Sequence, residues 1–377
     1  MHPFKKPFYI IGHNPNTIEE AKDFLQAGAN GLEPDIVFAN NKFYISHEEQ
    51  SSYDNIITLE NYLQGLTNLL RGNAYPLAFI IWDIKTTNFN PNEFIIIVKN
   101  CLAEFFDTVC MLMTHADDHL FLSKYNGAYS NVGIGVDESN TSALALQSFF
   151  TSAKQKNFSY ADGITTILTK PGVYKNIREA QRCQAYYPTQ SFSYIYTWVL
   201  SQTPAMKKYL NLYIDAIMVD ITAVDKLLGL INELPYKNVY DLATPGYNPF
   251  TSAPATRYIL EIKTADETMA GTNGSFIFTI AGAEEKKLES LPFHAGNEND
   301  LERGSLTALI IQGADVGPVT SLTILMTEGG LLAGWLPESI VLTCSGSDIK
   351  STFIFNPQNR NEWLSVGQTI TKYPVYS

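Results

Sequence analysis

The stretch IIGHNPNTIEEAKDFLQAGANGLEPDIVFANNKFYISH, residues 10–47, decides how the fold of this chain is interpreted. A short apolar strand ends at His13, a helical segment follows, and a second apolar strand carries Glu33 and Asp35. A third short strand leads to His47. In β/α proteins, catalytic and binding residues gather at the ends of the strands. This order of segments therefore predicts a β/α architecture whose functional site begins in this stretch.

Strand and helix patterns alternate from here to about residue 228. Short apolar segments predict strands at 8–11, 31–38, 43–45, 77–84, 108–113, 132–136, 163–168, 193–199 and 216–219. Helical periodicity predicts helices at 17–27, 59–71, 91–106, 144–154 and 204–212. Alternation on this scale predicts a parallel sheet, and about eight strand–helix units predict a closed (β/α)8 TIM barrel. A doubly wound open sheet is the alternative, although no GxGxxG motif follows the first strand.

A second domain is expected, because a chain of 377 residues exceeds the usual size of one. Residues 234–256 are rich in proline and break the alternation, which indicates a connector. Short alternating strands follow, separated by turn sequences such as AGTNG and GADVGP, and they predict an antiparallel β-sandwich. We therefore expect a barrel at 1–233, a connector at 234–256 and a sandwich at 257–377.

Composition narrows the classes of partner. The net charge of −12 and the pI near 5.0 argue against a nucleic-acid partner. No apolar run approaches the roughly 20 residues of a membrane span. The start, MHPFKKPFYIIG, lacks the features of a signal peptide, so either the protein is not exported this way or the numbered chain begins after processing. Four scattered cysteines without a CxxC pair predict buried free thiols rather than a disulfide scaffold.

The acidic residues suggest a metal site. Glu33 and Asp35 are two positions apart on a predicted strand, so both side chains should face the same side. Asp83, in the strand IIWDIK, adds a third carboxylate, and Lys85 should point to the same face. Clustered carboxylates repel each other unless a cation lies between them, and Mg²⁺ or Ca²⁺ suits oxygen ligands. The alternatives are a simple Asp83–Lys85 ion pair and a solvated strand edge at Glu33 and Asp35.

Two histidines complete this set. His13 and His47 follow predicted strands and have carboxylates nearby. Either one alone would more often be a structural histidine, but the combination suits metal-assisted phosphoryl chemistry, in which one histidine attacks or accepts a proton while the other protonates the leaving oxygen. His115 and His119, in THADDHL, form an alternative metal pair with the aspartates between them.

The opening stretch resembles the sphingomyelinase D/phospholipase D toxin family, a branch of the glycerophosphodiester phosphodiesterase-like barrels. His13 and Asn16 match the family's GHxxN motif, and GANGLEPDIVF and IWDIKT match two further motifs. The resemblance implies a TIM barrel in which Glu33, Asp35 and Asp83 bind Mg²⁺, with Ca²⁺ as the alternative. It also implies His13 and His47 as the catalytic pair, Lys85 as a phosphate contact, and Asn16 among the substrate-binding residues.

Other parts of the barrel match less completely. YIYTWVL resembles a family motif whose tryptophan, here Trp198, lines the substrate mouth. ATPGYNPF, residues 243–250, resembles a tail that plugs the opposite end of the family's barrel. Asp220 stands where the family has asparagine, and the loop after His47 lacks the paired cysteines of the venom enzymes. The resemblance therefore leaves the role of residue 220 and the substrate preference open.

The C-terminal segment resembles a PLAT domain, the β-sandwich of lipoxygenases and pancreatic-type lipases. Asp266, Ala270–Asn273, Glu302–Ser305 and Trp335 carry the pattern. Such domains dock lipids or proteins, sometimes with Ca²⁺ bound at loop carboxylates. The resemblance implies peripheral membrane contact through this domain, and a purely structural sandwich is the alternative.

Together these features predict a secreted, monomeric phospholipase D-type phosphodiesterase. The expected substrate is sphingomyelin or a lysophospholipid with a free hydroxyl near the phosphate. By family analogy that hydroxyl attacks phosphorus, forms a cyclic phosphate and releases the headgroup. His47 is assigned to activate the hydroxyl or attack directly and His13 to protonate the leaving oxygen, with the reverse assignment open. A soluble glycerophosphodiester phosphodiesterase and a non-catalytic lipid-binding protein are the alternatives.

Overall fold

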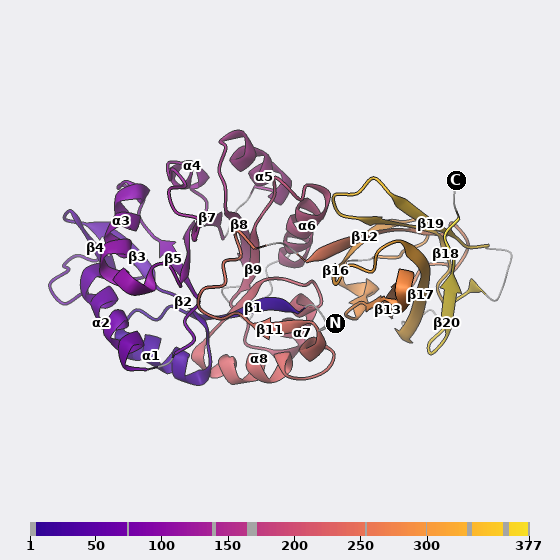
Figure 1. Ribbon diagram of the computed structural model, residues 1–377, viewed down its shortest axis with the longest axis horizontal. Coiled ribbons are helices and arrows are strands. Elements are labelled where there is room, and N and C mark those ends of the chain that lie inside the picture. The colour runs from indigo at the N-terminus through magenta and orange to yellow at the C-terminus, as the bar shows by residue number, and fades with distance from the viewer. Residues whose placement is uncertain are drawn as a thin grey trace.

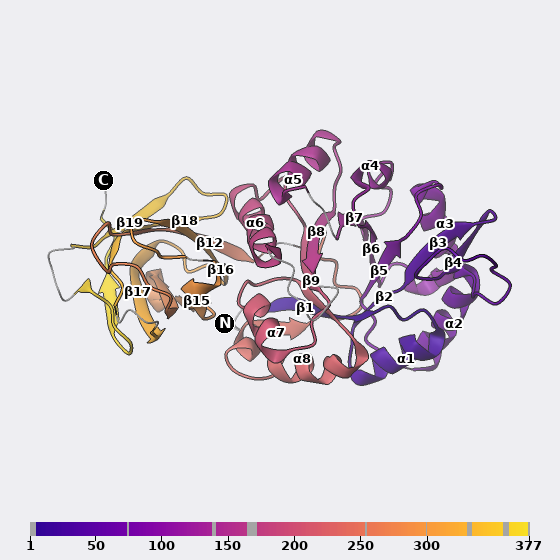
Figure 2. The ribbon, with the colours of Figure 1, turned by 180° about the vertical axis from the view of Figure 1, so that it is seen from behind.

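The computed structural model describes residues 5–73, 75–137, 141–163, 172–252, 255–298, 300–329, 334–356 and 362–375. A β/α barrel and a β-sandwich lie side by side along the long axis of the molecule (Figure 1). The view from behind shows the same arrangement, with the N-terminal end of the described chain at their boundary (Figure 2).

The barrel is a closed ring of parallel strands, so the predicted (β/α)8 fold is confirmed. Its strands are β1 (Lys6–His13), β2 (Gly31–Glu33), β3 (Asp35–Ala39), β5 (Phe79–Ile84), β6 (Cys110–His115), β7 (Val132–Val136), β8 (Phe158–Gly163), β9 (Tyr194–Trp198) and β10 (Ala216–Val219). The ring runs β1–β10–β9–β8–β7–β6–β5, and β2 closes it by pairing with both β5 and β1. β3 continues the position of β2 and pairs with β5 farther along.

Three predicted strands were wrong in detail. The expected strand 31–38 is two strands, β2 and β3, separated by Pro34, whose nitrogen has no hydrogen to donate to a ladder. The expected strand 43–45 is β4 (Lys42–Ile45), an antiparallel hairpin partner of β3 rather than a barrel strand. Asn40 and Asn41 have positive φ, as tight hairpin turns require. β8 ends where the strand 163–168 was expected to begin, and residues 164–171 lie outside the described residues.

Helices lie outside the ring of strands (Figures 1 and 2). They are α1 (Ile18–Ala27), α2 (Leu59–Gly72), α3 (Pro91–Leu102), α4 (His119–Leu122), α5 (Ala143–Ser152), α6 (Val173–Tyr186), α7 (Thr203–Leu210) and α8 (Val224–Ile231). The sequence pattern missed α6, because its buried face includes the polar residues Arg178, Gln181 and Gln184, which disguise the apolar period. That face is polar because α6 packs against β12 and β16 of the sandwich as well as against β8 and β9.

The C-terminal part is an antiparallel two-sheet sandwich, as predicted. One sheet has the order β16 (Leu306–Gly313), β12 (Thr256–Thr264), β18 (Pro337–Cys344) and β19 (Lys350–Ile354). The other contains β14 (Lys287–Glu289), β13 (Ser275–Gly282), β17 (Val319–Glu328) and β20 (Thr369–Lys372), with β15 (Phe293–His294) on β13. Trp335 is fully buried against Phe276, with 4.8 Å between ring centroids, and anchors the core of the sandwich.

The connector closes the end of the barrel at which the strands begin. β11 (Tyr240–Leu242) adds to the edge of β1, and the chain then turns under the barrel. The ring of Phe250 lies 6.1 Å from that of Phe79, and the Gly246 amide donates to the Thr108 carbonyl at 2.7 Å. These contacts place the segment where a plug would lie. The domain limits at residues 233 and 256 stay a prediction.

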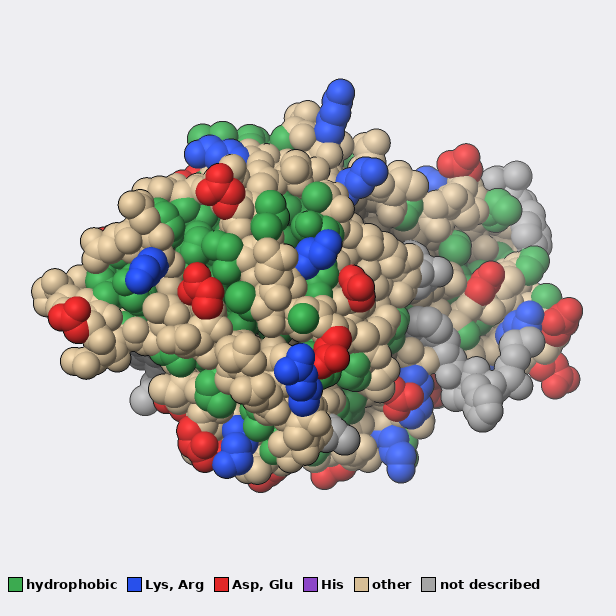
Figure 3. Space-filling view, turned by 60° about the vertical axis from the view of Figure 1, so that its left-hand side comes forward, with side chains coloured by type: hydrophobic (Ala, Val, Ile, Leu, Met, Phe, Trp, Pro, Cys, Tyr) green, Lys and Arg blue, Asp and Glu red, His purple; other side chains and the backbone are tan. Residues whose placement is uncertain are grey.

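The charged side chains, the helices and the cysteines can be compared with what the composition predicts. Acidic and basic side chains are interspersed on the barrel face shown in Figure 3. Among the described residues, no helix combines the length and apolar character that crossing a membrane requires. All four cysteines are free, as expected, but only Cys110 and Cys183 are fully buried.

A buried ion pair holds the sandwich to the barrel. Arg178 on α6 binds Asp300 at 2.5 Å and donates to the Ala308 carbonyl at 2.9 Å. Both charged side chains are less than a tenth exposed. The pair therefore fixes how the two domains meet.

Replacing Asp300 with alanine is expected to lower the free energy of unfolding by about 3 kcal/mol, because it leaves the Arg178 charge buried without a partner. The double variant R178M/D300L should recover most of the loss, since neither charge then remains. Urea unfolding followed by tryptophan fluorescence measures both. As a control, R303A removes an exposed pair with Asp266 and should cost less than about 0.5 kcal/mol. Equal losses in D300A and R303A would contradict a stabilising role for the buried pair.

Candidate active site

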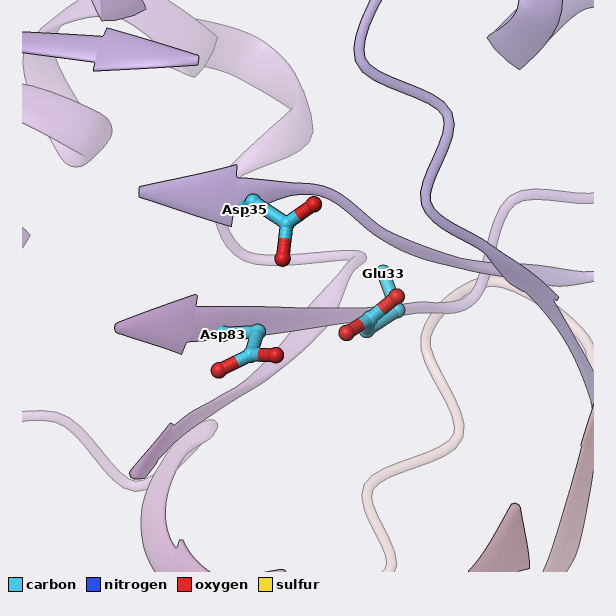
Figure 4. A group of neighbouring side chains, drawn as sticks. All are labelled: Glu33, Asp35 and Asp83. Carbon is cyan, nitrogen blue, oxygen red and sulfur yellow. The ribbon is translucent and has the colours of Figure 1, made fainter. Parts of the chain in front are cut away.

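Three carboxylates meet at the end of the barrel where the strands finish (Figure 4). Glu33 ends β2, Asp35 begins β3, and Asp83 lies opposite Asp35 on β5. One ligand oxygen from each lies within 4.8 Å of the other two, and Glu33 and Asp35 are buried. The structure thus brings together the three residues that the sequence singled out, although Pro34 separates the first two into different strands.

The cluster carries more negative charge than its neighbours neutralise. Lys85 contacts Asp35 at 2.9 Å and Asp83 at 2.5 Å, so the expected Asp83–Lys85 pair exists but is shared. Burial opposes the charged form of this lysine, yet Asp83 and Asp35 beside it raise the pKa of Lys85. Burial, together with Asp83 and Asp35, raises the pKa of Glu33 well above its ordinary value. Three carboxylates against one lysine leave a formal charge of −2, which a divalent cation would balance.

Two asparagines orient the buried carboxylates. The Asn14 backbone amide donates to Glu33 Oε2 at 2.9 Å, and the Asn16 amide group both donates to Asp35 Oδ2 at 2.8 Å and accepts from the Asp35 backbone at 3.0 Å. Asn16 also donates to the Asn14 side chain. Asn14 adopts a positive φ of 59°, which asparagine tolerates better than most residues. The structure thus places Asn16 as a positioning residue for Asp35, and its predicted contact with substrate stays a prediction.

His13 and His47 each have one ring nitrogen beside a carboxylate. His47 Nδ1 lies 3.3 Å from Asp35 Oδ1, and His13 Nδ1 lies 3.1 Å from Asp220 Oδ1. His13 also lies next to Glu33 in the register of β1 and β2. In both rings Nε2 has no hydrogen-bond partner among the described residues, and the predicted catalytic role of the two histidines stays a prediction. Asp220 departs from the family's sequence pattern, and its place beside His13 could not be predicted from the sequence.

The aromatic residues at the end of β9 lie near this site. Trp198 is half-buried, and its indole nitrogen donates to the Asp137 carbonyl at 2.8 Å. Gly163 lies directly beneath, because a Cβ there would fall 2.3 Å from the Trp198 ring. Tyr196 is fully buried, and Glu33 and Asp83 are among the groups that raise its pKa after burial itself. Trp198 therefore has a fixed ring at the barrel mouth, and its predicted contact with substrate stays a prediction.

The alternative metal pair at His115 and His119 does not form. His115 Nδ1 is within 3.2 Å of the backbone amides of Asp117 and Asp118, where it acts as an acceptor. Within the described ranges, Glu33, Asp35 and Asp83 are the only three His, Cys, Asp or Glu residues that bring ligand atoms within 4.8 Å of one another.

The loop that follows His47 is held by a contact between two tilted tyrosine rings. The rings of Tyr44 and Tyr53 lie 4.4 Å apart, and the Tyr53 hydroxyl accepts from the Gln50 amide at 3.0 Å. The loop returns to the hairpin through a bridge between Tyr44 and Thr58. These contacts connect both ends of the loop without a disulfide.

Models of two protein families match the chain. A model described as dermonecrotic toxin SPH matches residues 4–250, and a PLAT/LH2 domain model matches residues 258–372. Among similar proteins, dermonecrotic toxin LlSicTox-alphaIV1i of Loxosceles laeta is 24% identical over 278 residues, which are 64% of this chain and 99% of the toxin. Dermonecrotic toxin SpaSicTox-betaIIA3 of Sicarius patagonicus is 22% identical over 282 residues, 64% of this chain and 98% of the toxin.

Solved structures resemble each part separately. A glycerophosphodiester phosphodiesterase from Parabacteroides distasonis is 14% identical, covers 61% of this chain and 100% of its own, and gives a TM-score of 0.45. A coral 8R-lipoxygenase is 24% identical over 31% of this chain, with a TM-score of 0.28. This chain spans 17% of the length of that lipoxygenase.

Proposed function

Because the chain belongs to the dermonecrotic toxin SPH family, we propose that it is a Mg²⁺-dependent phospholipase D-type phosphodiesterase. Its substrate is sphingomyelin or a lysophospholipid, whose headgroup it releases while the lipid part closes into a cyclic phosphate. The observation that carries the proposal is the arrangement of His13 and His47 beside a three-carboxylate cluster, each with Nδ1 next to an aspartate.

The carboxylates fit a hard divalent cation. All three offer oxygen, the preferred ligand of Mg²⁺, and two are buried with a net negative charge left over. Ca²⁺ takes the same kind of ligand and is the second candidate. When bound by Glu33, Asp35 and Asp83, the ion supplies positive charge to the phosphate oxygens. Lys85 adds a second positive charge to this face of the site.

The two histidines account for the proton balance. The substrate hydroxyl gives its proton to Nε2 of His47 as its oxygen bonds to phosphorus, and the bond from phosphorus to the headgroup oxygen breaks. His13, protonated, gives its Nε2 proton to that leaving oxygen. One proton is taken up and one is released, so each turnover leaves the total unchanged and exchanges the histidine protonation states.

Asp220 is proposed as a positioning residue that orients His13. Asp220→Asn keeps an acceptor oxygen facing Nδ1 and is expected to retain activity within about threefold, whereas Asp220→Ala should lose about tenfold because the ring can rotate. Steady-state rates of choline release from lysophosphatidylcholine measure both. If D220N and D220A lose the same amount, the oxygen at this position does not orient His13.

The decisive test compares substrates. The protein is incubated with Mg²⁺ and sphingomyelin, lysophosphatidylcholine or glycerophosphocholine, and choline release is followed together with ³¹P NMR of the phosphorus products. Cyclic phosphate from a lipid is the expected product. Activity on glycerophosphocholine alone would identify a soluble glycerophosphodiester phosphodiesterase, and no activity on any substrate would favour a lipid-binding protein.

The sandwich is proposed to bring the barrel to its lipid. A PLAT/LH2 model matches it, and it exposes apolar side chains including Leu306, Ile349 and Tyr373. Exposed apolar side chains on such a domain suit peripheral contact with a membrane. Ca²⁺ at loop carboxylates of this domain is part of the same proposal, as are secretion and a monomeric state.

A further inference from the structure

A cavity of about 690 Å³ lies at the opposite end of the barrel from the carboxylates, against the sandwich. We call it the basal cavity. Its walls come from the start of β1, the segments that precede β8 and β9, the connector, β12 and β16. They include Lys6, Tyr9, Ser191, Arg257 and Gln312. Since it contains residues of both domains, it exists only when the sandwich is docked.

The basal cavity is basic in an otherwise acidic protein. Its lining has one carboxylate, Asp215, and five cationic side chains: Lys5, Lys6, Lys154, Lys156 and Arg257. Asp215 binds Lys6 at 2.8 Å, and Lys5 binds Asp241 at 2.9 Å. Among the described residues, no carboxylate lies within ion-pairing distance of the other three. With a net charge of −12 on the whole chain, this local excess of positive charge is not a consequence of composition.

Several residues that line this space also have a buried hydrogen-bonding atom without a partner. Among the described residues, five residues of the lining each have one buried atom with no hydrogen-bond partner: Tyr9 Oη, Thr151 Oγ1, Ser191 Oγ, Arg257 Nε and Gln312 Nε2. Every one of these atoms can donate a hydrogen bond. A buried donor without an acceptor costs free energy. A group of such donors in the walls of one cavity therefore indicates a ligand rich in acceptors.

The local geometry shows what surrounds two of these donors, on Arg257 and Gln312. Arg257 and Gln312 are paired residues on β12 and β16. Lys6 donates to Gln312 Oε1 at 3.2 Å, whereas Nε2 of the same amide has no partner among the described residues. Asp215 Oδ2 accepts from the Ile195 amide at 2.7 Å, so this carboxylate is already shared between Lys6 and the backbone. Burial lowers the pKa of both Lys6 and Arg257, which an anion beside them would oppose.

We propose that the basal cavity binds the phosphoryl group of a phosphate monoester. Arg257 and Gln312 hold the phosphate oxygens, with hydroxyl donors from Tyr9 and Ser191, and Lys154 and Lys156 neutralise further charge at the exposed rim. A tetrahedral dianion offers more acceptor sites than a carboxylate and matches this many donors. The volume leaves room for an organic group beyond the phosphate. Because the ligand touches both domains, its binding stabilises their docking.

The first experiment measures binding of inorganic phosphate to the full chain by calorimetry, in Tris buffer freed of divalent cations on a chelating resin. Saturable binding at one site is expected, and R257M should weaken it at least about tenfold. R71M, the same substitution at an exposed arginine on α2, should leave the affinity within about twofold. No saturable binding, or equal affinity for wild type and R257M, would overturn the proposal.

A second variant covers the case in which R257M does not fold. K154M/K156M changes two exposed side chains and should weaken phosphate binding at least about threefold while circular dichroism stays unchanged. An unchanged affinity in this variant would also overturn the proposal. Both tests are independent of the catalytic site, since neither measures turnover.

Two further probes distinguish the source of the phosphoryl group. Glycerol 3-phosphate represents a soluble monoester, and phosphatidylcholine vesicles with or without phosphatidic acid represent a lipid headgroup. Tighter binding of glycerol 3-phosphate than of inorganic phosphate supports a soluble ligand. Sedimentation with phosphatidic acid vesicles that is lost in R257M supports the lipid. If neither probe binds and inorganic phosphate occupies the cavity alone, the monoester assignment is overturned.

Discussion

Replacing His47 with alanine is expected to lower the rate of headgroup release by about 10³-fold, within the range that a positioned acid or base contributes. The His47 side chain is 58% exposed, so removing it should leave the melting temperature unchanged. His13→Ala should cause a loss of similar size, because the reaction needs a proton acceptor and a proton donor at the same time. Choline release from lysophosphatidylcholine and a thermal melt of each variant measure the two effects.

The matched control is His119→Ala. His119 packs against Phe149 with 4.6 Å between ring centroids and has no proposed role in the reaction. This variant should therefore keep activity within about twofold. Because His47 is exposed, added imidazole should enter the space left in H47A and restore part of the rate. Loss of folding in H13A or H47A would instead favour structural histidines, and retention of full activity would remove them from the mechanism.

Much of the site could be predicted because it is encoded locally. His13, Glu33, Asp35 and His47 fall within one strand–helix–strand–strand segment, and parallel strands bring their ends to one edge. Asp83 could be added because it ends an apolar strand and precedes Lys85 by two residues. The sequence pattern could not show that Lys85 binds Asp35 as well as Asp83. This second contact depends on the register of β3 and β5.

The remaining errors arise where tertiary contacts override local signals. Pro34 ended a strand that its apolar neighbours favoured, yet the two carboxylates still converge because β2 and β3 both pair with β5. β8, whose sequence is FSYADG, is buried along its whole length although Ser159 and Asp162 interrupt its apolar residues, so its apolar signal was weak. Helix α6 was hidden by side chains that serve the domain interface. The contact of Asn14 with Glu33 depends on its positive φ, which the sequence pattern does not predict.

The basal cavity could not be predicted from the sequence either. Lys6, Asp215, Arg257 and Gln312 are distant in sequence and belong to different elements, and only the docking of the sandwich brings them together. None of the four lies in a recognisable sequence motif. A site built across two domains cannot be found by reading either domain alone.

Glu33→Gln is expected to abolish stabilisation by Mg²⁺, to lower activity by about 10²-fold or more, and to raise the melting temperature of the metal-free protein. Glu33 is the better choice than Asp83, because Asp83 also binds Lys85 and its loss would disturb that pair. The third effect follows from charge: burial, Asp83 and Asp35 all disfavour the ionised form of Glu33, which is why its pKa is raised. Glutamine keeps the shape and the hydrogen bond from Asn14 but carries no charge.

The stability difference between E33Q and wild type should change with pH in a defined direction. In the metal-free protein the folded state holds the Glu33 proton more tightly than the unfolded state, where the pKa is about 4.3. The contribution of Glu33 to the free energy of unfolding is therefore fully present below that value and is lost as pH rises through the raised folded pKa. The advantage of E33Q over wild type should be larger at pH 8 than near pH 5, where wild-type Glu33 is more protonated.

Mg²⁺ competes with that proton, so its stabilising effect on wild type should grow as pH rises. Thermal melts of wild type, E33Q and the exposed-site control E60Q, each with and without Mg²⁺ across this pH range, measure every part of the prediction. E60Q should behave as wild type, because Glu60 is exposed on α2. A Mg²⁺ effect that persists in E33Q, or one that does not change with pH in wild type, would place the cation elsewhere. In that case the three carboxylates would be balanced by Lys85 and protonation alone.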